Sequence, residues 1–221
     1  MAAQLQMPPQ FLDWMLLPIS GLNDHGALWD SKYRATDRLW SEEPNEFVAS
    51  IIDEIPVGRL VDIAGGEGRN ALAFAQRGWF VENVEISKVA LERFEKHARQ
   101  LGVEEYCSST LADAREARFQ LEPSLILVAY LQMPMAHLEQ ALDNALAQLK
   151  AGALLGVFHA RRNLTDGYGG PPSPAVLPTI EHLESWAQKH GLSAKVQERI
   201  RSLIVDGQPR QAIDVTIEVQ R

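Results

Sequence analysis

The 221-residue sequence predicts an α/β domain with a doubly wound, mostly parallel sheet of about seven strands. Two observations predict this fold class. First, short apolar runs alternate along the chain with segments of helical periodicity, which is typical of parallel strands joined by helices. Second, the chain ends on two β-rich runs around Asp206-Gly207, and apolar and polar residues alternate strictly from Ile213 to Val219. That period indicates a half-exposed strand, so we expect a C-terminal antiparallel hairpin.

The individual elements follow in order from Pro44. Apolar residues recur at helical spacing from Phe47 to Ile55 behind Pro44-Asn45, which predicts an opening helix closed by Pro56. Strands are expected at 60–63, 79–85, 106–112, 125–130 and 153–158. Further helices are expected at 70–77, at 137–150, near 181–190, and between a Ser87 cap and a Gly102 stop.

Composition and charge narrow the class of function. The 21 Lys and Arg residues against 29 Asp and Glu residues leave a formal charge of −8, whereas nucleic-acid binding needs a basic face. The single Cys107 excludes a disulfide framework and a multi-cysteine zinc site, and the histidines lack metal-ligand spacing. We therefore expect a cytoplasmic protein without a metal, a nucleic-acid partner or a membrane partner.

The N-terminal residues 1–28 are interpreted as an arm, and residues 29–221 as one domain. The arm holds one apolar patch, 11–19, which is too short to span a membrane. It is either a surface-packed leader or a cover for a substrate pocket or a partner subunit. In the second case the covering residues are Phe11, Trp14, Met15 and Leu16.

The turn after the first predicted strand is the first candidate site, since ligands of open α/β sheets bind beyond the carboxyl ends of the strands. Gly65, Gly66 and Gly68 allow a ligand to approach the backbone without a Cβ in the way. Alone, this turn also fits a loose dinucleotide-binding pattern. Asp62 distinguishes a dinucleotide site from a site for an amino-acid-like cofactor. Dinucleotide folds usually keep an apolar residue at this position, whereas a carboxylate can hold an amino group. The turn therefore favours an amino-acid-like cofactor over a pyrophosphate.

Two further acids end the next two predicted strands. Glu85 can accept hydrogen bonds from the 2′ and 3′ hydroxyls of a ribose. Asp113 can accept one from an exocyclic adenine amine. Three successive strands thus each end in a carboxylate suited to one part of an adenosyl amino acid.

The segment 61–71 resembles the first motif of class I S-adenosylmethionine-dependent methyltransferases. Its Glu-Gly-Arg-Asn-Ala stretch is similar to the tellurite-resistance and thiopurine-type small-molecule branch. The resemblance continues through 84–87, 112–113 and 149–155, and upstream through 29–33, 39–40 and 43–45, so that it covers the chain from Trp29 to the C-terminus.

This resemblance implies a Rossmann-like fold and S-adenosyl-L-methionine as the cofactor. It places the three glycines along the methionine portion, Asp62 near its amino group, Glu85 at the ribose and Asp113 at the adenine. The other implied contacts are Asn70, Ile86, Leu111, Ala112, Ala129 and Tyr130. Two positions depart from the pattern: Ala64 replaces a glycine, and Gly65 replaces the cysteine usual in this branch. We expect the Ala64 methyl group to be tolerated provided that this residue keeps a β conformation.

The acceptor end of the site is less clearly patterned. His159, at the end of the strand 153–158, is the candidate general base, and Arg161 with Arg162 is placed to hold an anionic acceptor. Gln132, Met133 and Met135 are candidate lining residues, and the Gly- and Pro-rich loop 163–178 is expected to be a mobile lid. The segment 129–134 lacks the Asp/Asn-Pro-Pro-aromatic motif of methyltransferases acting on base amines, which favours a small acceptor.

The function expected from these observations is methyl transfer to the oxygen, sulfur or chalcogen oxyanion of a small molecule, by a monomer or homodimer. Two alternatives stay open. One is a nicotinamide-dependent oxidoreductase, although Asp62 and the terminal hairpin argue against it. The other is a non-catalytic module that senses a cofactor or binds a partner.

Overall fold

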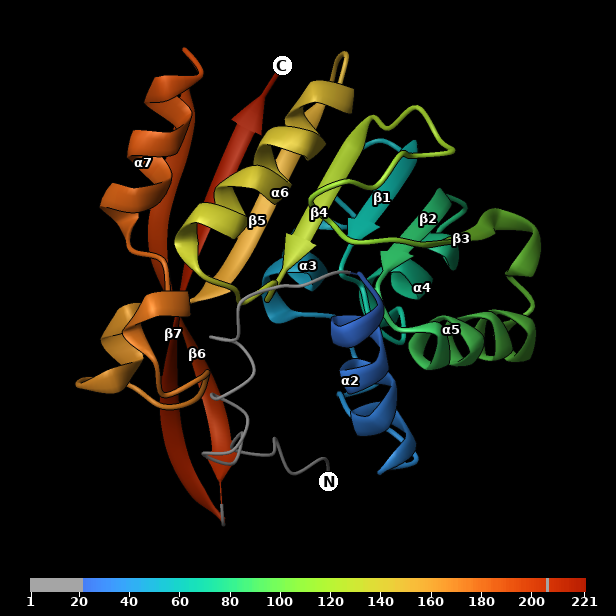
Figure 1. Ribbon diagram of the computed structural model, residues 1–221, viewed down its shortest axis with the longest axis horizontal. Helices are drawn as coiled ribbons and strands as arrows, with labels where there is room; N and C mark the ends of the chain where they lie inside the picture. Colours follow the sequence, from blue (N-terminus) through green and yellow to red (C-terminus); the bar gives the residue numbers. More distant parts are fainter. Residues whose placement is uncertain (1–21, 206) are drawn as a thin grey trace.

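A seven-stranded mixed sheet forms the centre of the molecule, in the order β3-β2-β1-β4-β5-β7-β6 (Figure 1). The computed structural model describes residues 22–205 and 207–221. The strands are β1 (Arg59–Ile63), β2 (Phe80–Glu85), β3 (Cys107–Leu111), β4 (Leu125–Ala129), β5 (Ala153–His159), β6 (Ala194–Val205) and β7 (Gln208–Gln220). Neighbouring strands are parallel except β7, which runs antiparallel to both β5 and β6. The predicted sheet and its terminal hairpin are confirmed.

Six α-helices accompany these strands in the described part of the chain. They are α2 (Leu22–Arg34), α3 (Glu46–Ile51), α4 (Arg69–Ala75), α5 (Lys88–Leu101), α6 (Met135–Gln148) and α7 (Ile180–Lys189). Short 3₁₀ turns lie at η2 (Glu104–Tyr106), η3 (Arg161–Leu164) and η4 (Pro174–Val176). Within these residues, no helix combines the length and apolarity needed to cross a bilayer.

The sequence did not predict α2. It begins at Leu22, so it includes residues on both sides of the boundary at residue 28 between the expected arm and domain. The predicted covering residues Phe11, Trp14, Met15 and Leu16 lie outside the described residues.

Helices cover the sheet on both faces because successive strand side chains point in opposite directions. Val61 and Ile63 of β1 belong to the apolar cluster formed with α6 and α7. Leu60 of the same strand packs in the cluster formed with α3, α4 and α5. Figure 1 shows α6 crossing in front of the sheet. Because both faces of the sheet are buried, the parallel strands appear in the amino-acid sequence as continuous apolar runs.

The predicted cap at Ser87 and stop at Gly102 are confirmed, whereas the opening helix, expected to continue to Pro56, ends at Ile51. Asn45 caps α3, and its side-chain oxygen accepts hydrogen bonds from the backbone N–H groups of Phe47 and Val48. Ser87 caps α5 by accepting from the N–H of Ala90, and Gly102 ends that helix with a φ of 68°. These local contacts satisfy backbone groups that a helix end leaves without partners.

The five parallel strands each differ from the expected bounds by one residue at one or both ends, and the difference at the end of β4 affects the site. The strand expected at 125–130 ends at Ala129, because Tyr130 adopts a φ of 60°. The Tyr130 N–H still donates to the carbonyl of Val157 on β5, at 2.7 Å. The left-handed conformation turns the chain out of the sheet at this point and directs the tyrosine into the space above the strand ends.

The terminal hairpin is longer than predicted. β5 pairs with β7 from Asp214 to Gln220, whereas residues 208–213 pair with β6 alone. Figure 1 shows this part of the hairpin extending past the carboxyl ends of the parallel strands. It therefore forms a side wall above the edge at which ligands of such sheets bind.

The glycine before α4 generates a stability prediction. Gly68 has a φ of 81°, and a Cβ there would lie 2.1 Å from a ring carbon of Phe94 in the core. Left-handed strain costs about 1–2 kcal/mol and overpacking a further 1–3 kcal/mol, so Gly68→Ala should lower the free energy of unfolding by about 2–5 kcal/mol. Urea denaturation measures this loss.

Gly78→Ala is the matched control. Gly78 has a similar φ of 83°, but a Cβ there would meet no atom within 4 Å. This variant should therefore lose only the conformational part, about 1–2 kcal/mol. Equal losses in the two variants would contradict the predicted collision with Phe94.

Candidate functional site

A pocket of about 490 Å³ lies above the carboxyl ends of the parallel strands. The chain builds β1, β2 and β3 outward in one direction and then returns to place β4 on the other side of β1. Ligands bind at such a switch point because the connections leave the strand ends in opposite directions there. The predicted site residues that line the pocket are Gly65, Gly66, Asn70, Glu85, Ile86, Ala112, Asp113, Ala129, Tyr130, Gln132, Met133 and His159.

Six described residues assigned from the sequence are not among the lining residues: Asp62, Gly68, Leu111, Met135, Arg161 and Arg162. Asp62 is fully buried beneath the turn, and Leu111 is half exposed on the surface. Arg161 donates a hydrogen bond to the carbonyl of Pro174 at 3.1 Å, and its neighbour Arg162 pairs on the surface with Glu198. Neither arginine lies where an acceptor in this pocket would meet it.

The turn between β1 and α4 departs from the sequence expectation at Ala64. Ala64 has a φ of 55°, not a β conformation, and Gly66 follows it with a φ of 58°. Left-handed residues are needed here because the chain passes from β1 to α4 in five residues. The Ala64 methyl group is therefore accommodated at a strained position, which is where the family pattern has glycine.

The protein's own packing explains two of the predicted glycines better than the approach of a ligand does. A Cβ on Gly65 would lie 2.3 Å from Oδ1 of Asn83 and 2.8 Å from Oδ2 of Asp62. A Cβ on Gly68 would enter the ring of Phe94. Gly65 and Gly66 nevertheless line the pocket, so the same small residues keep its floor open.

Asp62 and Asn83 form a group of buried acceptors beneath this floor. Both carboxyl oxygens of Asp62 and the amide oxygen of Asn83 are without a hydrogen-bond partner among the described residues. Burial raises the pKa of Asp62 to about 7. A buried acceptor without a donor is costly, so this group fits a ligand that brings hydrogen-bond donors or a positive charge to the turn.

Glu85 is held rigidly at the pocket wall. Its Oε2 accepts from the N–H of Gly66 at 3.1 Å, and its Oε1 accepts from the N–H groups of Ile86 and Ser87, both at 2.9 Å. Burial raises its pKa against the opposing effect of these three bonds. Because Oε2 accepts only one bond from the described residues, it retains capacity for a ligand hydroxyl.

Asp113 has a charged partner. Arg115 donates to both carboxylate oxygens, from Nε at 2.9 Å and Nη2 at 2.5 Å. Burial acts to raise the pKa of Asp113, but hydrogen bonds from the Arg115 side chain and N–H bring it below its ordinary value. The carboxylate therefore stays ionised and oriented at the end of β3.

A clasp, formed by Glu67 and Arg93, closes the pocket on the α2 side. Glu67 accepts from the N–H groups of Leu39 and Trp40, at 3.0 and 3.4 Å, and from Arg93 at 2.9 Å. Arg93 in turn donates to the carbonyl of Tyr33 at 2.6 Å. The clasp ties the segment after α2 to the glycine turn. Glu67 stands within the predicted motif, but no pattern in the sequence indicates this role.

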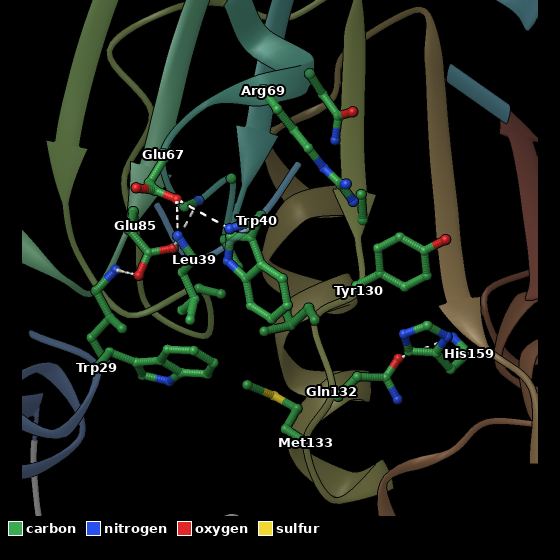
Figure 2. Close-up of a pocket in the computed structure, with 18 of the residues that line it drawn as sticks. Trp29, Leu39, Trp40, Glu67, Arg69, Glu85, Tyr130, Gln132, Met133 and His159 are labelled. Carbon is green, nitrogen blue, oxygen red and sulfur yellow. Dashed lines mark hydrogen bonds between the residues drawn. The ribbon is translucent and has the colours of Figure 1, made fainter. Parts of the chain in front are cut away.

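The acceptor end of the pocket contains a linked polar group. His159 stacks on Tyr130 with ring centroids 4.4 Å apart, and its Nδ1 lies 3.5 Å from Oδ1 of Asp214, its cross-strand neighbour. Asp214 Oδ2 accepts from the Tyr130 hydroxyl at 2.7 Å and from Nε of Arg201 at 2.5 Å. Asn45 donates to the Tyr130 hydroxyl at 2.8 Å. Figure 2 shows Tyr130 and His159 together at one side of the pocket.

Sequence analysis missed Arg201 and Asp214. Both are charged yet less than a tenth exposed, and they face each other across the hairpin. Arg201 lies in a strand whose exposure does not follow a simple alternation. Asp214 was counted as one of the polar, exposed positions of the alternating run. No signal in the sequence distinguishes it from them, because its burial depends on the neighbouring strand.

The Gly- and Pro-rich loop reaches the pocket. Tyr168, Gly169 and Gly170 are lining residues, and the loop contains the turns η3 and η4. Asn163 anchors its start through two hydrogen bonds with the backbone of Ile213, both 2.7 Å. The loop therefore contributes a wall at the acceptor end, and its motion as a lid stays a prediction.

Comparisons with known proteins agree with this architecture. Residues 60–152 match a methyltransferase domain. That match runs from β1 to the residue before β5, so it includes the glycine turn and the ends of β2, β3 and β4. Among curated proteins, none matches the chain in sequence.

Several solved structures share the fold at low sequence identity. One, from a study of the conversion of a disulfide bond into a thioacetal group during echinomycin biosynthesis, has a TM-score of 0.72 and 14% identity, over 89% of this chain and 92% of the other. Magnesium protoporphyrin IX methyltransferase (ChlM) from Synechocystis PCC 6803 with bound SAH has a TM-score of 0.69 and 13% identity, over 90% and 99%. TehB from Haemophilus influenzae has a TM-score of 0.64 and 15% identity, over 89% and 66%.

The strained turn leads to a prediction for Ala64. Glycine adopts a positive φ without the steric cost that alanine carries, so Ala64→Gly should raise the free energy of unfolding by about 0.5–1 kcal/mol. The same substitution at Ala49, an exposed position within α3, should lower it by about 0.5–1 kcal/mol. Urea denaturation of both variants shows whether the free energy of unfolding changes in opposite directions. A loss of stability in Ala64→Gly would contradict the strain.

The buried carboxyl leads to a prediction about pH. Asp62 keeps its proton in the folded state up to about pH 7, whereas the unfolded chain releases it near pH 4. Between these values the folded state binds more protons, so this group's contribution to stability falls as pH rises. Asp62→Asn removes that slope. We expect its stability relative to wild type to increase from pH 4 to pH 7 in urea titrations, and parallel profiles would contradict the raised pKa.

Proposed function

We propose that the protein is a class I S-adenosylmethionine-dependent methyltransferase that acts on a small-molecule acceptor. The observation that carries the proposal is one pocket in which the glycine turn, Glu85 and Asp113 meet above three adjacent strand ends. The methyltransferase-domain match over residues 60–152 covers all three features. The similarity of the Glu-Gly-Arg-Asn-Ala stretch to the tellurite-resistance and thiopurine-type branch, together with the fold shared with magnesium protoporphyrin IX methyltransferase, supports an acceptor of low molecular mass.

The residues present fit S-adenosylmethionine. Asp62 and Asn83 leave buried acceptors beneath the turn where the amino group of the methionine portion would lie. Glu85 would hold the ribose hydroxyls through Oε2, and Asp113 the adenine amine. Ile86 and Ala112 line the wall between these two acids and would flank the adenine ring.

The cofactor supplies an electrophilic methyl group on a sulfonium, so the chain mainly has to orient the acceptor and exclude water. Trp29, Trp40 and Met133 form apolar walls for this purpose (Figure 2). His159 would take the proton of a hydroxyl or thiol acceptor on Nε2, because its Nδ1 faces Asp214. Gln132 fixes this histidine by accepting its backbone N–H at 3.1 Å.

The test is a calorimetric titration with S-adenosylhomocysteine, with NAD in parallel. We expect S-adenosylhomocysteine to bind the wild-type protein and Glu85→Gln to weaken this binding about tenfold or more, since one charge-assisted hydrogen bond is lost. Glu92→Gln is the matched control, because Glu92 is exposed on α5 and outside the pocket. It should bind like wild type.

The other outcomes distinguish the alternatives. Binding of NAD without binding of S-adenosylhomocysteine would overturn the proposal in favour of an oxidoreductase. Tight binding of S-adenosylhomocysteine without turnover over a broad acceptor panel would favour the non-catalytic module. Equal loss of affinity in Glu85→Gln and Glu92→Gln would argue against the ribose contact.

A further inference from the structure

Most of the charged side chains that line the pocket have a partner within the protein. Four ion pairs account for most of them, and Glu85 is satisfied by three backbone N–H groups. The pairs are Arg38–Glu42, Glu67–Arg93, Asp113–Arg115 and Arg201–Asp214. This leaves Arg69, at the start of α4, as the one lining arginine without an ion-pair partner among residues 22–205 and 207–221.

The surroundings of Arg69 give its guanidinium little compensation. Its one hydrogen bond in the described structure runs from Nη1 to the hydroxyl of Ser41, at 2.6 Å. The Arg69 Cζ lies 5.7 Å from the centroid of the Tyr130 ring. Burial lowers the pKa of Arg69 and the nearby Arg201 adds to this effect, while Tyr130, Asp62 and Asp214 oppose it without forming an ion pair with the guanidinium. A partly buried guanidinium with free donors is a site for an anion.

The position of Arg69 points to the acceptor rather than the adenosine. Figure 2 shows its side chain directed from α4 toward Tyr130, with His159 beyond that ring and Glu85 on the other side of the pocket. Arg201, the second guanidinium near Tyr130, lies 5.6 Å from the ring centroid but is neutralised by Asp214. The free positive charge is therefore at the end of the pocket that holds the candidate base.

The cofactor does not neutralise this charge. S-adenosylmethionine carries two cationic groups, the sulfonium and the ammonium, and only one carboxylate. Its arrival therefore adds positive charge to the pocket. With Asp62 opposite the ammonium, the sulfonium and the carboxylate of the cofactor would balance each other, and the charge of Arg69 would remain for a second, negatively charged ligand.

The remaining walls define what the anion is attached to. Trp40, Leu131 and Met133 line the space beside Tyr130 and are suited to an aromatic ring, which packs against aromatic and thioether groups in offset or edge arrangements. The fork of N–H donors on one free guanidinium matches the planar, two-oxygen geometry of a carboxylate.

We propose that Arg69 binds the carboxylate of the methyl acceptor and that the acceptors of this site are aromatic acids. This inference rests on the proposed function and specifies its substrate class. The aromatic ring lies beside Tyr130, the carboxylate meets the Arg69 guanidinium, and the hydroxyl, thiol or second acidic group that receives the methyl group faces His159.

Binding of acceptor fragments to the complex with S-adenosylhomocysteine tests the proposal. The probes are benzoate and 2-naphthoate, each compared with its neutral counterpart, benzyl alcohol or 2-naphthalenemethanol, in NMR and calorimetric titrations. We expect the acids to bind more tightly than the alcohols and Arg69→Gln to weaken the acids about 10- to 100-fold while leaving the alcohols unchanged. Arg77→Gln, the same substitution on the surface just beyond α4, should leave all four affinities unchanged.

A second pair of titrations separates the acceptor from the cofactor. S-adenosylhomocysteine carries a carboxylate and 5′-methylthioadenosine does not. If Arg69→Gln weakens the first and not the second, Arg69 binds the cofactor carboxylate and the inference is overturned. Equal binding of acids and alcohols to the wild-type complex also overturns it. Failure of the wild-type protein to bind S-adenosylhomocysteine would instead refute the proposed function, and the acid titrations without it would still test Arg69 as an anion site.

Discussion

The clasp of Glu67 and Arg93 is the interaction on which the shape of the pocket depends. Glu67 is 4% exposed and sits inside the turn that joins β1 to α4. Its carboxylate connects that turn to α5 through Arg93 and to the segment after α2 through the backbone of Leu39 and Trp40. Charge-assisted bonds in a buried setting are strong and directional, so one side chain holds three separate parts of the chain in register. The clasp acts together with the hydrogen bonds that Asp30 accepts from Ser87 and Val89 to hold the α2 side of the pocket in place.

The pocket has two ends of different structural origin. Glu85, Asp113 and the glycine turn come from the carboxyl ends of parallel strands, where a bound nucleoside is expected in open α/β sheets. Arg201, Leu203 and the loop around Tyr168 come from the hairpin and the segment before α7. The proposed cofactor end is thus built by the strand ends of the sheet, and the proposed acceptor end by the hairpin and the loop before α7.

Tyr130 joins the two ends. Its left-handed backbone conformation lifts it out of β4, and its hydroxyl is held between Asn45 and Asp214. His159 stacks on one part of this ring, and the guanidinium groups of Arg69 and Arg201 lie near it. A strained residue kept in place by surrounding hydrogen bonds is common at functional sites, where it fixes side chains in a defined arrangement. Here the arrangement brings a candidate base and an uncompensated cation to the same ring.

The sequence by itself determined the sheet, the hairpin, the presence of five of the six described α-helices and the three acids at the strand ends. These features are local: apolar periodicity, caps such as Asn45 and Ser87, and carboxylates that directly follow apolar runs. Only the tertiary structure decided the acceptor end, because its residues are brought together from distant strands. Asp214 is buried by β5 and β6, Arg69 is left without a counter-ion by the surrounding pairs, and Arg161 is turned away from the pocket by Pro174. The conformation of Ala64 is likewise a consequence of the turn as a whole, since the residue's identity alone favours the β or α region.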